Sequence, residues 1–170
     1  MKRKSLSSMD CPVALALDQV GEWWSLLILR DALQGSTRFE QFRESLDISP
    51  TMLTRRLSDL IEVGLLKKTS GSGGSSRDEY CVTDKSRDLS PVLIMLFAWG
   101  RRHVKRKGWG VDLIDLQTGR MVDPIVIDGK TGLPINRKTH AFVSGPHATA
   151  STLKRLGPRQ DNEPKQQSGS

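Results

Sequence analysis

The chain has 170 residues, a length that favours one ordinary domain with extensions over two large domains. Its 26 lysines and arginines against 19 acidic residues give a net charge of +7, which favours a polyanionic partner such as nucleic acid over a merely soluble basic protein. No apolar run reaches the roughly 18 residues that span a bilayer, and the N-terminus lacks a secretory pattern, so we expect no membrane partner. The two cysteines fit a reducing cytoplasm.

The first part of the chain predicts four helices. The first begins at Pro12 and ends at Gly21, and the second is apolar on nearly every side and ends at Gly35. A short third helix has Phe39, Phe42 and Leu46 at helical spacing. The fourth has the clearest boundaries, because Ser49 is a good N-cap, Pro50 suits the first turn and Gly64 ends the helix.

Two short strands and a long helix are expected next. The uncharged run at 71–76 lies between β-favouring segments, so residues 66–82 predict a hairpin with a glycine-serine tip. Thr83 then caps a helix in which Pro91 predicts a kink or break. Residues 91–99 are apolar all round, which favours a second subunit as cover.

Beyond Gly108 a D-x-x-T-G pattern occurs twice, at 115–119 and 128–132. Aspartate can bond its own backbone and glycine can adopt positive φ, so we expect a small β-meander, either a packed appendage or a ligand site. The polar end of the chain predicts disorder. The expected organisation is a flexible arm (1–10), a winged-helix domain (11–107), a β extension (108–147) and a disordered tail (148–170).

Three helices, a well-capped fourth, a hairpin and a further helix form a winged helix-turn-helix plan, mainly α with a small β-hairpin wing. The strings CPVALALDQVGEWWSLLILRDAL, RFEQFR, ISPTMLTRRLSDLIEVGLL and EYCVTDK resemble the HxlR family of bacterial winged-helix regulators over roughly residues 11–100. The chain departs from the family pattern at Glu22 and Trp23, where Gly and Lys are usual, at Ser86, where Gly is common, and in a wing without prolines.

The resemblance implies a homodimer that binds operator DNA. The first and last helices of the domain would form the dimer interface. The interface residues we expect are Val13, Leu17, Val92, Met95, Leu96 and Trp99.

The fourth helix also predicts DNA recognition from its own pattern. At about 100° per residue, Leu53, Leu57, Leu60 and Ile61 lie on one side. The first two turns of the other side would enter the major groove, with helix 50–63 as recognition helix. The expected base-reading residues are Thr51, Met52, Thr54 and Arg55. The alternative is an ordinary solvated surface helix.

Phosphate contacts would position the protein without reading sequence. The expected contacts lie before and on the recognition helix and on the wing: Arg38, Ser49, Arg56, Ser58, Lys67, Lys68 and Arg77. Any of these residues could instead be ordinary solubilising charge. Arg56, at the flank of the helix, could equally pair with an acid.

Cys11 precedes the proline of the first helix, where backbone N–H groups can lower the pKa of a thiol. Some HxlR-type regulators use an N-terminal cysteine to sense oxidants or electrophiles, and Cys11 stands at the matching position. The alternative is an inert packing cysteine. The three histidines have no metal-ligand spacing, and no nucleotide-binding motif occurs, so we expect no metal, no cofactor and no enzyme.

The sequence therefore predicts a cytoplasmic, homodimeric regulator, a repressor of transcription, that binds double-stranded DNA and responds to a thiol-reactive or small-molecule effector. The alternative is a winged-helix protein-protein interaction module without operator binding.

Overall fold

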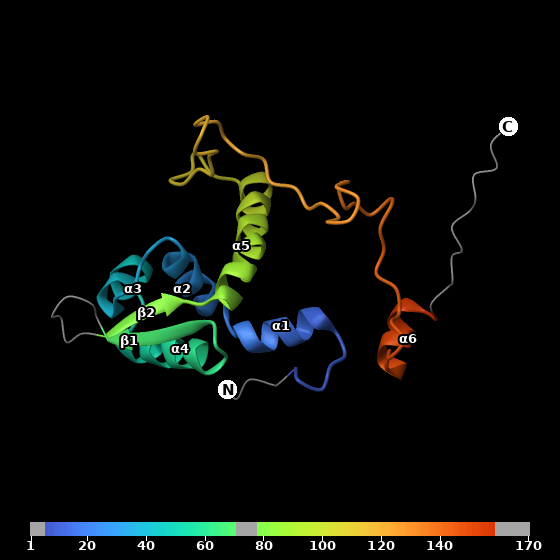
Figure 1. Cartoon of the computed structure of the whole chain (residues 1–170), viewed down its shortest axis with the longest axis horizontal. Coiled ribbons are helices and arrows are strands. Elements are labelled where there is room, and N and C mark those ends of the chain that lie inside the picture. The colour runs from blue at the N-terminus through green and yellow to red at the C-terminus, as the bar shows by residue number, and fades with distance from the viewer. Residues whose placement is uncertain (1–5, 71–77, 159–170) are drawn as a thin grey trace. The chain divides into compact units, whose positions relative to one another are not determined.

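A computed structural model describes residues 6–70 and 78–158 of the chain (Figure 1). The wing tip expected at 71–76, and Arg77 with it, lie outside the described residues. The elements in chain order are α1 (Pro12–Val20), α2 (Trp23–Leu33), α3 (Phe39–Leu46), α4 (Pro50–Glu62), β1 (Leu66–Ser70), β2 (Asp78–Val82), α5 (Asp84–His103) and α6 (Ala150–Leu156). The order α1 to α5 is the predicted winged-helix order.

The chain divides into two compact units, residues 19–125 and residues 1–18 with 126–170. This division differs from the expected boundary after residue 107. The guanidinium of Arg101 donates to the Asp112 carboxylate, and Arg102 lies 3.3 Å from the Asp123 carboxylate. These ion pairs tie the first turn of the extension to α5, so it belongs to the winged-helix unit.

The core of the winged-helix unit lies between α2, α3, α4 and the root of the hairpin. Its buried side chains are Val20, Ile28, Leu29, Ala32, Phe42, Ile48, Leu53, Leu57, Leu60, Leu65 and Leu66. The leucines of α4 recur at helical spacing and share one inward face, whereas α2 buries Ser25 and Asp31 together with its apolar side chains. The opposite face of α4 remains in solvent.

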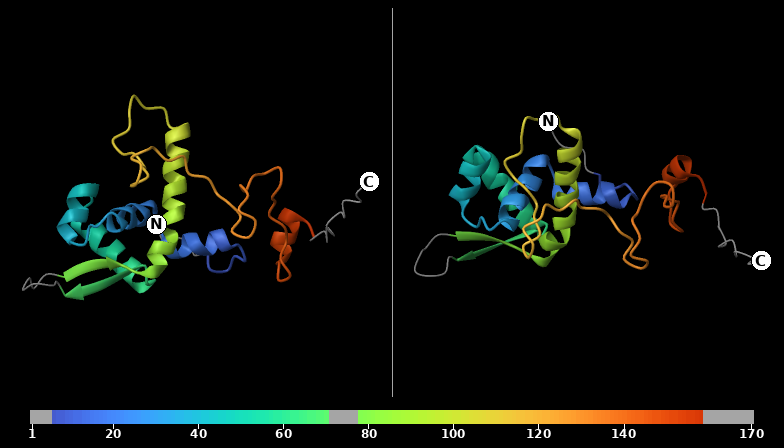
Figure 2. Two further views of the ribbon diagram at one scale, coloured as in Figure 1. Left: turned by 45° about the horizontal axis from the view of Figure 1, so that its top comes forward. Right: turned by 90° about the horizontal axis from the view of Figure 1, so that it is seen from above.

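The hairpin is antiparallel and pairs Leu66 with Val82 through Ser70 with Asp78. The Tyr80 amide donates to the Thr37 carbonyl at 2.7 Å, so the free edge of β2 is joined to the segment before α3. The Tyr80 ring packs edge-on against Phe42. Within this unit the hairpin lies beside α4, while α5 leads away from it (Figures 1 and 2).

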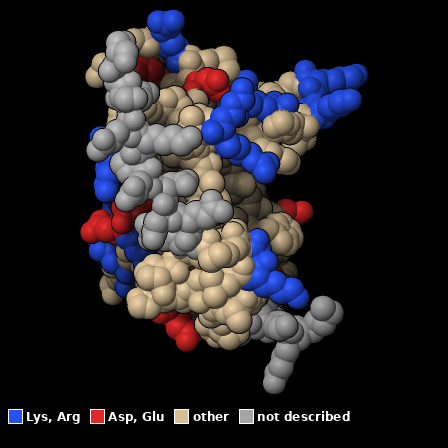
Figure 3. All heavy atoms as spheres, turned by 90° about the vertical axis from the view of Figure 1, so that its right-hand side faces the viewer, with Lys and Arg blue, Asp and Glu red and all other residues tan. Residues whose placement is uncertain are grey.

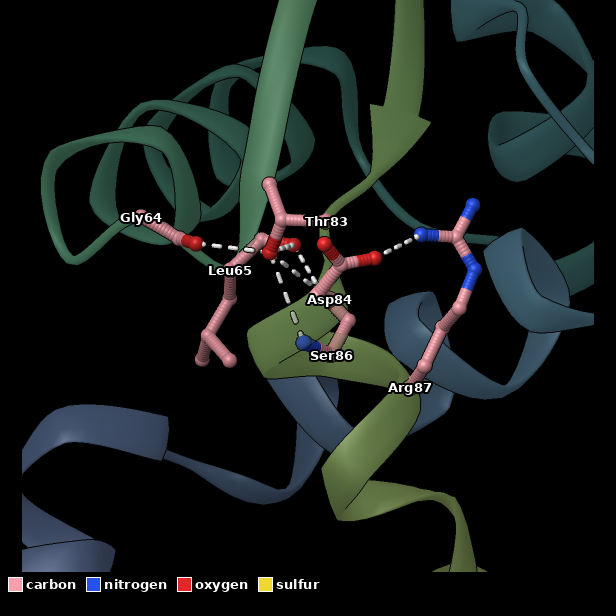
Figure 4. A network of polar contacts seen from close by, with 6 residues as sticks. All are labelled: Gly64, Leu65, Thr83, Asp84, Ser86 and Arg87. Atoms are coloured by element: carbon pink, nitrogen blue, oxygen red, sulfur yellow. Dashed lines mark hydrogen bonds and ion pairs between the residues drawn. The ribbon is translucent and has the colours of Figure 1, made fainter.

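A hydroxyl network joins the end of α4 to the start of α5 (Figure 4). Thr83 Oγ1 donates to the Gly64 carbonyl at 2.8 Å, and the same oxygen caps the Ser86 amide. The buried Ser86 hydroxyl donates to the Leu65 carbonyl. Thr83 caps α5 as predicted, and α5 continues through Pro91 without the predicted break.

The extension forms its two predicted turns but almost no sheet. The Gly119 amide donates to the Asp115 carbonyl and the Gly132 amide to the Asp128 carbonyl, each at 2.8 Å, and both glycines have positive φ. Beyond each turn, pairing is limited to one bridge, Ile114–Met121 or Ile127–Pro134. The expected meander is thus reduced to two closed turns, because each carboxylate satisfies its own turn and the strands after it are too short to pair further.

The prediction of disorder from residue 148 is wrong for the first part of that segment. Thr149 caps the Thr152 amide and α6 follows. Both threonines also donate to the Asp10 carboxylate at 2.7 Å, a contact 139 residues distant in sequence that no local pattern indicates. In the part of the chain that the structure describes, no helix is long and apolar enough to cross a membrane.

Candidate nucleic-acid interface

A tight turn at residues 47–49 sets the angle between α3 and α4. Asp47 adopts the left-handed conformation, with φ 48° and ψ 43°, a conformation that aspartate tolerates better than most residues. Ile48 is buried beneath the turn. Ser49 then accepts the Met52 amide and starts α4 with Pro50 in the first turn, as predicted. The two helices therefore form a helix-turn-helix.

The exposed face of α4 carries hydrogen-bonding side chains without a carboxylate in its first two turns. Thr51, Thr54, Arg55 and Ser58 are all exposed, while Leu53, Leu57 and Leu60 opposite them are buried. This division confirms the two faces that the sequence predicts for α4. The face presents hydroxyls and one guanidinium, groups that can bond base edges or phosphate oxygens.

Met52 does not share that face fully. Its side chain is half-buried and packs against the core. The thioether is committed to packing, so we do not retain Met52 as a base contact.

The sequence leaves two roles open for Arg56, a phosphate contact or a pair with an acid, and the structure shows the pair with acids. Its side chain is 6% exposed, with Nη2 2.6 Å from the Glu22 carboxylate and Nη1 3.1 Å from the Asp59 carboxylate. Both ion pairs hold the guanidinium inside the protein. Arg56 therefore fastens α4 to Glu22, the residue before α2, while the neighbouring Arg55 is exposed.

Three described cations lie on the elements packed against α4, at the start of α3 and on the wing. Arg38 lies 3.9 Å from the Glu79 carboxylate, and Lys68 Nζ lies 2.7 Å from the Asp78 carboxylate. The Asp78 hydrogen bond and charge raise the pKa of Lys68. Lys67 is exposed and is the cation of this group that makes no ion pair with a described residue. Figure 3 shows lysine and arginine side chains exposed alongside acidic ones on the face it draws.

A row of apolar side chains on α5 is open to solvent. Val92, Leu96 and Trp99 are 48%, 50% and 58% exposed and follow one another at helical spacing, with Met95 half-buried beside them. On α1, Val13 and Leu17 are 60% and 49% exposed. These are the residues that the sequence predicts for a dimer interface.

Cys11 lies at the N-terminus of α1. Hydrogen bonds from the Ala14 and Val13 amides lower the pKa of its thiol, and the nearby positive charge of Arg155 lowers it further. The predicted effect of the helix N-terminus on this thiol is confirmed in direction. Cys11 and Cys81 are both free thiols.

Sequence reasoning missed the partners of these residues. Glu22 stands out in the sequence only as a departure from the family pattern, yet it holds Arg56. Gln41 accepts the amides of Thr37 and Arg38 and so caps α3, which its position three residues into the helix could have indicated. The roles of Asp10 and Arg155 have no local sequence signal, because Asp10 meets Thr149, and Arg155 approaches Cys11, only in the folded chain.

A family described as HxlR-like helix-turn-helix matches residues 19–108. The chain belongs to this family. The HTH-type transcriptional regulator Rv3095 of Mycobacterium tuberculosis, of uncharacterised function, is 36% identical over 135 residues, which cover 79% of this chain and 85% of the relative. A regulator of Mycobacterium bovis, Mb3122, matches with the same figures.

Solved structures show the same fold. PA1607, a candidate transcription factor, has a TM-score of 0.75 at 34% identity, covering 84% of this chain and all of its own. PA1374 from Pseudomonas aeruginosa, also a candidate transcription factor, has a TM-score of 0.58 at 42% identity. The match covers 86% of this chain and 100% of PA1374. The redox regulator HypR in its oxidised form has a TM-score of 0.52 at 28% identity. The match covers 56% of this chain and 100% of HypR.

The predicted winged-helix fold and HxlR resemblance are thus confirmed. The protein is a helix-turn-helix transcriptional regulator of the HxlR-like family. Its relatives and its fold are those of transcription regulators, which are not enzymes. Among the described residues, no cluster of histidine, cysteine and acidic side chains has the composition of a metal site.

Proposed function

We propose that the protein is a sequence-specific DNA-binding repressor that acts as a homodimer, with α4 in the major groove and the wing on the DNA backbone. The observation that carries the proposal is the exposed face of α4, where Thr51, Thr54 and Arg55 project beside a cap and before a wing. An ordinary surface helix needs neither the helix-turn-helix nor the hairpin next to it.

Each side chain of this face has a role that its chemistry allows. Arg55 offers a planar pair of donors that matches O6 and N7 of guanine. The hydroxyls of Thr51 and Thr54 bond a base or a phosphate, and those of Ser49 and Ser58 bond phosphates at the edges of the groove.

The cations around α4 supply attraction without reading sequence. Lys67 is available at once, while Lys68 and Arg38 would exchange Asp78 and Glu79 for a phosphate. We extend the same role to Arg77 from its sequence position alone.

The homodimer rests on the exposed apolar rows of α1 and α5. A row of large side chains about half exposed is costly for a single chain and favourable for an isologous contact. Two copies related by a twofold axis would place two recognition helices on one side of DNA, and the operator would then be a palindrome with half-sites about one helical turn apart. A dimer bound over a promoter represses by occupying it.

Fluorescence anisotropy with DNA from the protein's own upstream region tests this function. We expect Arg55→Ala to lose at least about tenfold in affinity, the loss typical of a bidentate base contact. Arg43→Ala is the matched control, because Arg43 is an exposed arginine on α3 that pairs with Glu40; it should bind as the unmodified protein does. Equal binding by both variants would remove Arg55 from the proposal.

The salt dependence of binding separates this function from a protein-interaction module. Neutralised phosphates release counterions, so the observed affinity for DNA should fall steeply as salt rises. No binding, or binding that is flat with salt, would favour the interaction module.

Cys11 supports a second candidate function, response to a thiol-reactive effector. The amide bonds and Arg155 lower the pKa of this thiol, so more of it is thiolate at neutral pH than in an ordinary cysteine. HypR, whose structure is described as that of a redox regulator, is similar to this chain. We propose that oxidation or alkylation of Cys11 releases the protein from DNA, or that a small-molecule effector acts in the same way.

Alkylation of the DNA-free protein by iodoacetamide tests the thiol. Cys11 should react faster than N-acetylcysteine at pH 7, and its rate should reach half of its maximum at a lower pH than the free thiol does. Cys11→Ser should keep its DNA affinity and lose any release by diamide, with Cys81→Ser as the control that retains it. Release that persists in Cys11→Ser would contradict the sensor role.

A further inference from the structure

The second part of the extension, from residue 126 on, is held by hydrogen bonds within its own turn. The Ile135 amide donates to the Val126 carbonyl and the Asp128 amide to the Leu133 carbonyl, at 2.9 and 2.8 Å. The Asp128 carboxylate accepts the Lys130 amide, which lowers its pKa. The backbone therefore needs no sheet or core to hold its shape.

The large apolar side chains of this segment are nevertheless in solvent. Phe142 is 88% exposed, and the other members of the set are between 45% and 62% exposed: Val126, Ile127, Leu133, Ile135 and Val143. Single exposed apolar side chains are normal on a protein surface, but so many exposed ones in one short segment are unusual. A preorganised segment with uncovered apolar side chains suits a partner surface.

The far end of the segment is fastened to the start of α1. The buried Ser144 hydroxyl donates to the Gly157 carbonyl, just after α6. The Asp10 carboxylate accepts the Thr149 amide and the Thr152 hydroxyl, both at 2.7 Å, and these bonds lower the pKa of Asp10 to about 2. The segment is thus joined to the helix whose Val13 and Leu17 belong to the proposed dimer interface.

Part of the extension is also shared with a solved structure. Residues 1–108 make up less than two thirds of the 170-residue chain, whereas the likeness to PA1607 covers 84% of it. That likeness must include part of the extension. The likeness to HypR covers 56% of the 170 residues, about the length of the winged-helix domain alone.

We propose that residues 126–157 are a dimerisation arm that lies across a second copy of this chain and covers the apolar row of its α5. The proposal rests on the homodimer proposed above and assigns the arm to it. We choose a second copy as the partner of the arm because the arm is bonded to the start of α1. The arm is therefore continuous with the proposed dimer interface. Each chain also presents both an apolar arm and an apolar row, and two copies can satisfy both sets reciprocally, as a twofold interface requires.

Site-specific photocrosslinking of the full chain tests the arm. Phe142 is replaced by p-benzoylphenylalanine in a chain with a large affinity tag, which is co-expressed with an untagged chain and irradiated. We expect a covalent product of tagged and untagged chains, with the adduct on residues 92–99 of the untagged one. The same replacement at Glu44, exposed on α3, is the control and should give no such product.

Sedimentation of the same samples distinguishes failure of the arm from failure of the homodimer. Adducts confined to one chain, or no adduct, in a protein that sediments as a dimer would overturn the arm and leave the homodimer standing. A monomer would overturn both.

Substitution of the same residue gives an independent measurement. Phe142→Asp should raise the dimer dissociation constant by at least about tenfold, because burial of a phenylalanine side chain contributes at least that factor. Leu116→Asp is the control, because Leu116 is 92% exposed in the first turn, outside the arm. This substitution should change the dimer dissociation constant by less than about twofold. Equal dissociation constants for Phe142→Asp and the unmodified protein would overturn the arm.

Discussion

Helix α4 and the extension after α5 both contain many large apolar residues, and the structure uses them in opposite ways. Leu53, Leu57 and Leu60 in α4 are at most 1% exposed, whereas Leu116 and Leu133 in the extension are 92% and 62% exposed. The difference lies in spacing. Apolar residues at helical spacing share one face and can be buried together, while a carboxylate-held turn points them outward in several directions.

This comparison teaches that apolar content does not by itself predict a core. In α4 the backbone is fixed by helix packing, so its stability depends on buried leucines. In the extension the turns are held by the Asp115 and Asp128 carboxylates, so the exposed apolar residues there are not needed to hold them.

The largest effect should come from deleting a buried leucine. Leu57→Ala should lower the free energy of unfolding by about 2–5 kcal/mol, because it removes buried methyl groups and leaves a cavity. Leu116→Ala should change it by less than about 0.5 kcal/mol, since the side chain is in solvent. Urea unfolding of the two variants measures both, and similar losses would contradict the comparison.

The adjacent arginines of α4 sharpen the same contrast within one helix. Arg56→Ala should cost about 1–3 kcal/mol of stability, because it removes bonds to Glu22 and Asp59 from a buried position. Arg55→Ala should be within about 0.5 kcal/mol of the unmodified protein, since Arg55 is exposed. Thermal unfolding monitored by circular dichroism compares them, and a larger loss for Arg55→Ala would refute this assignment of roles.

A smaller effect is expected at two threonines in similar local roles. Thr83→Ala should lower stability by about 1 kcal/mol, because Thr83 caps α5 and bonds the Gly64 carbonyl at the root of the hairpin. The Thr118 hydroxyl bonds only its near neighbours in sequence: it donates to the Asp115 carboxylate and accepts the Arg120 amide. Thr118→Ala should therefore leave the midpoint of urea unfolding unchanged, and equal shifts for both variants would contradict this expectation.

The smallest effect concerns low pH and the clasp, by which we mean the hydrogen bonds of Thr149 and Thr152 to the Asp10 carboxylate. Because folding lowers the pKa of Asp10 from 3.8 to about 2, the clasp is fully stabilising above pH 3.8 and is lost as pH falls toward 2. The chemical shift of the Thr149 amide should titrate in that lower range, and Asp10→Asn should remove the titration. A midpoint near pH 4 would mean that the carboxylate is not bonded.

Patterns that repeat along one element could be predicted from the sequence. The boundaries of α4 followed from Ser49, Pro50 and Gly64, because capping is decided by neighbouring residues. The same locality explains the success at the two D-x-x-T-G turns.

Features that depend on contacts distant in sequence could not be predicted. The burial of Arg56 depends on Glu22, 34 positions earlier in the chain, and a helical wheel of α4 alone places this arginine at the flank of the exposed face. Helix α6 depends on Asp10 in the same way. Its polar sequence predicts disorder, but Thr152 bonds the Asp10 carboxylate near the other end of the chain.

The central claim is that Arg55 on the exposed face of α4 reads a base. Binding-site selection from random DNA would define the operator, and affinities for every single base-pair change would then be compared between the unmodified protein and Arg55→Ala. We expect the variant to lose discrimination at one G·C pair in each half-site, by about 1–3 kcal/mol, and to keep it elsewhere. A loss of affinity that is uniform across all sequences, with discrimination intact at every position, would contradict the claim.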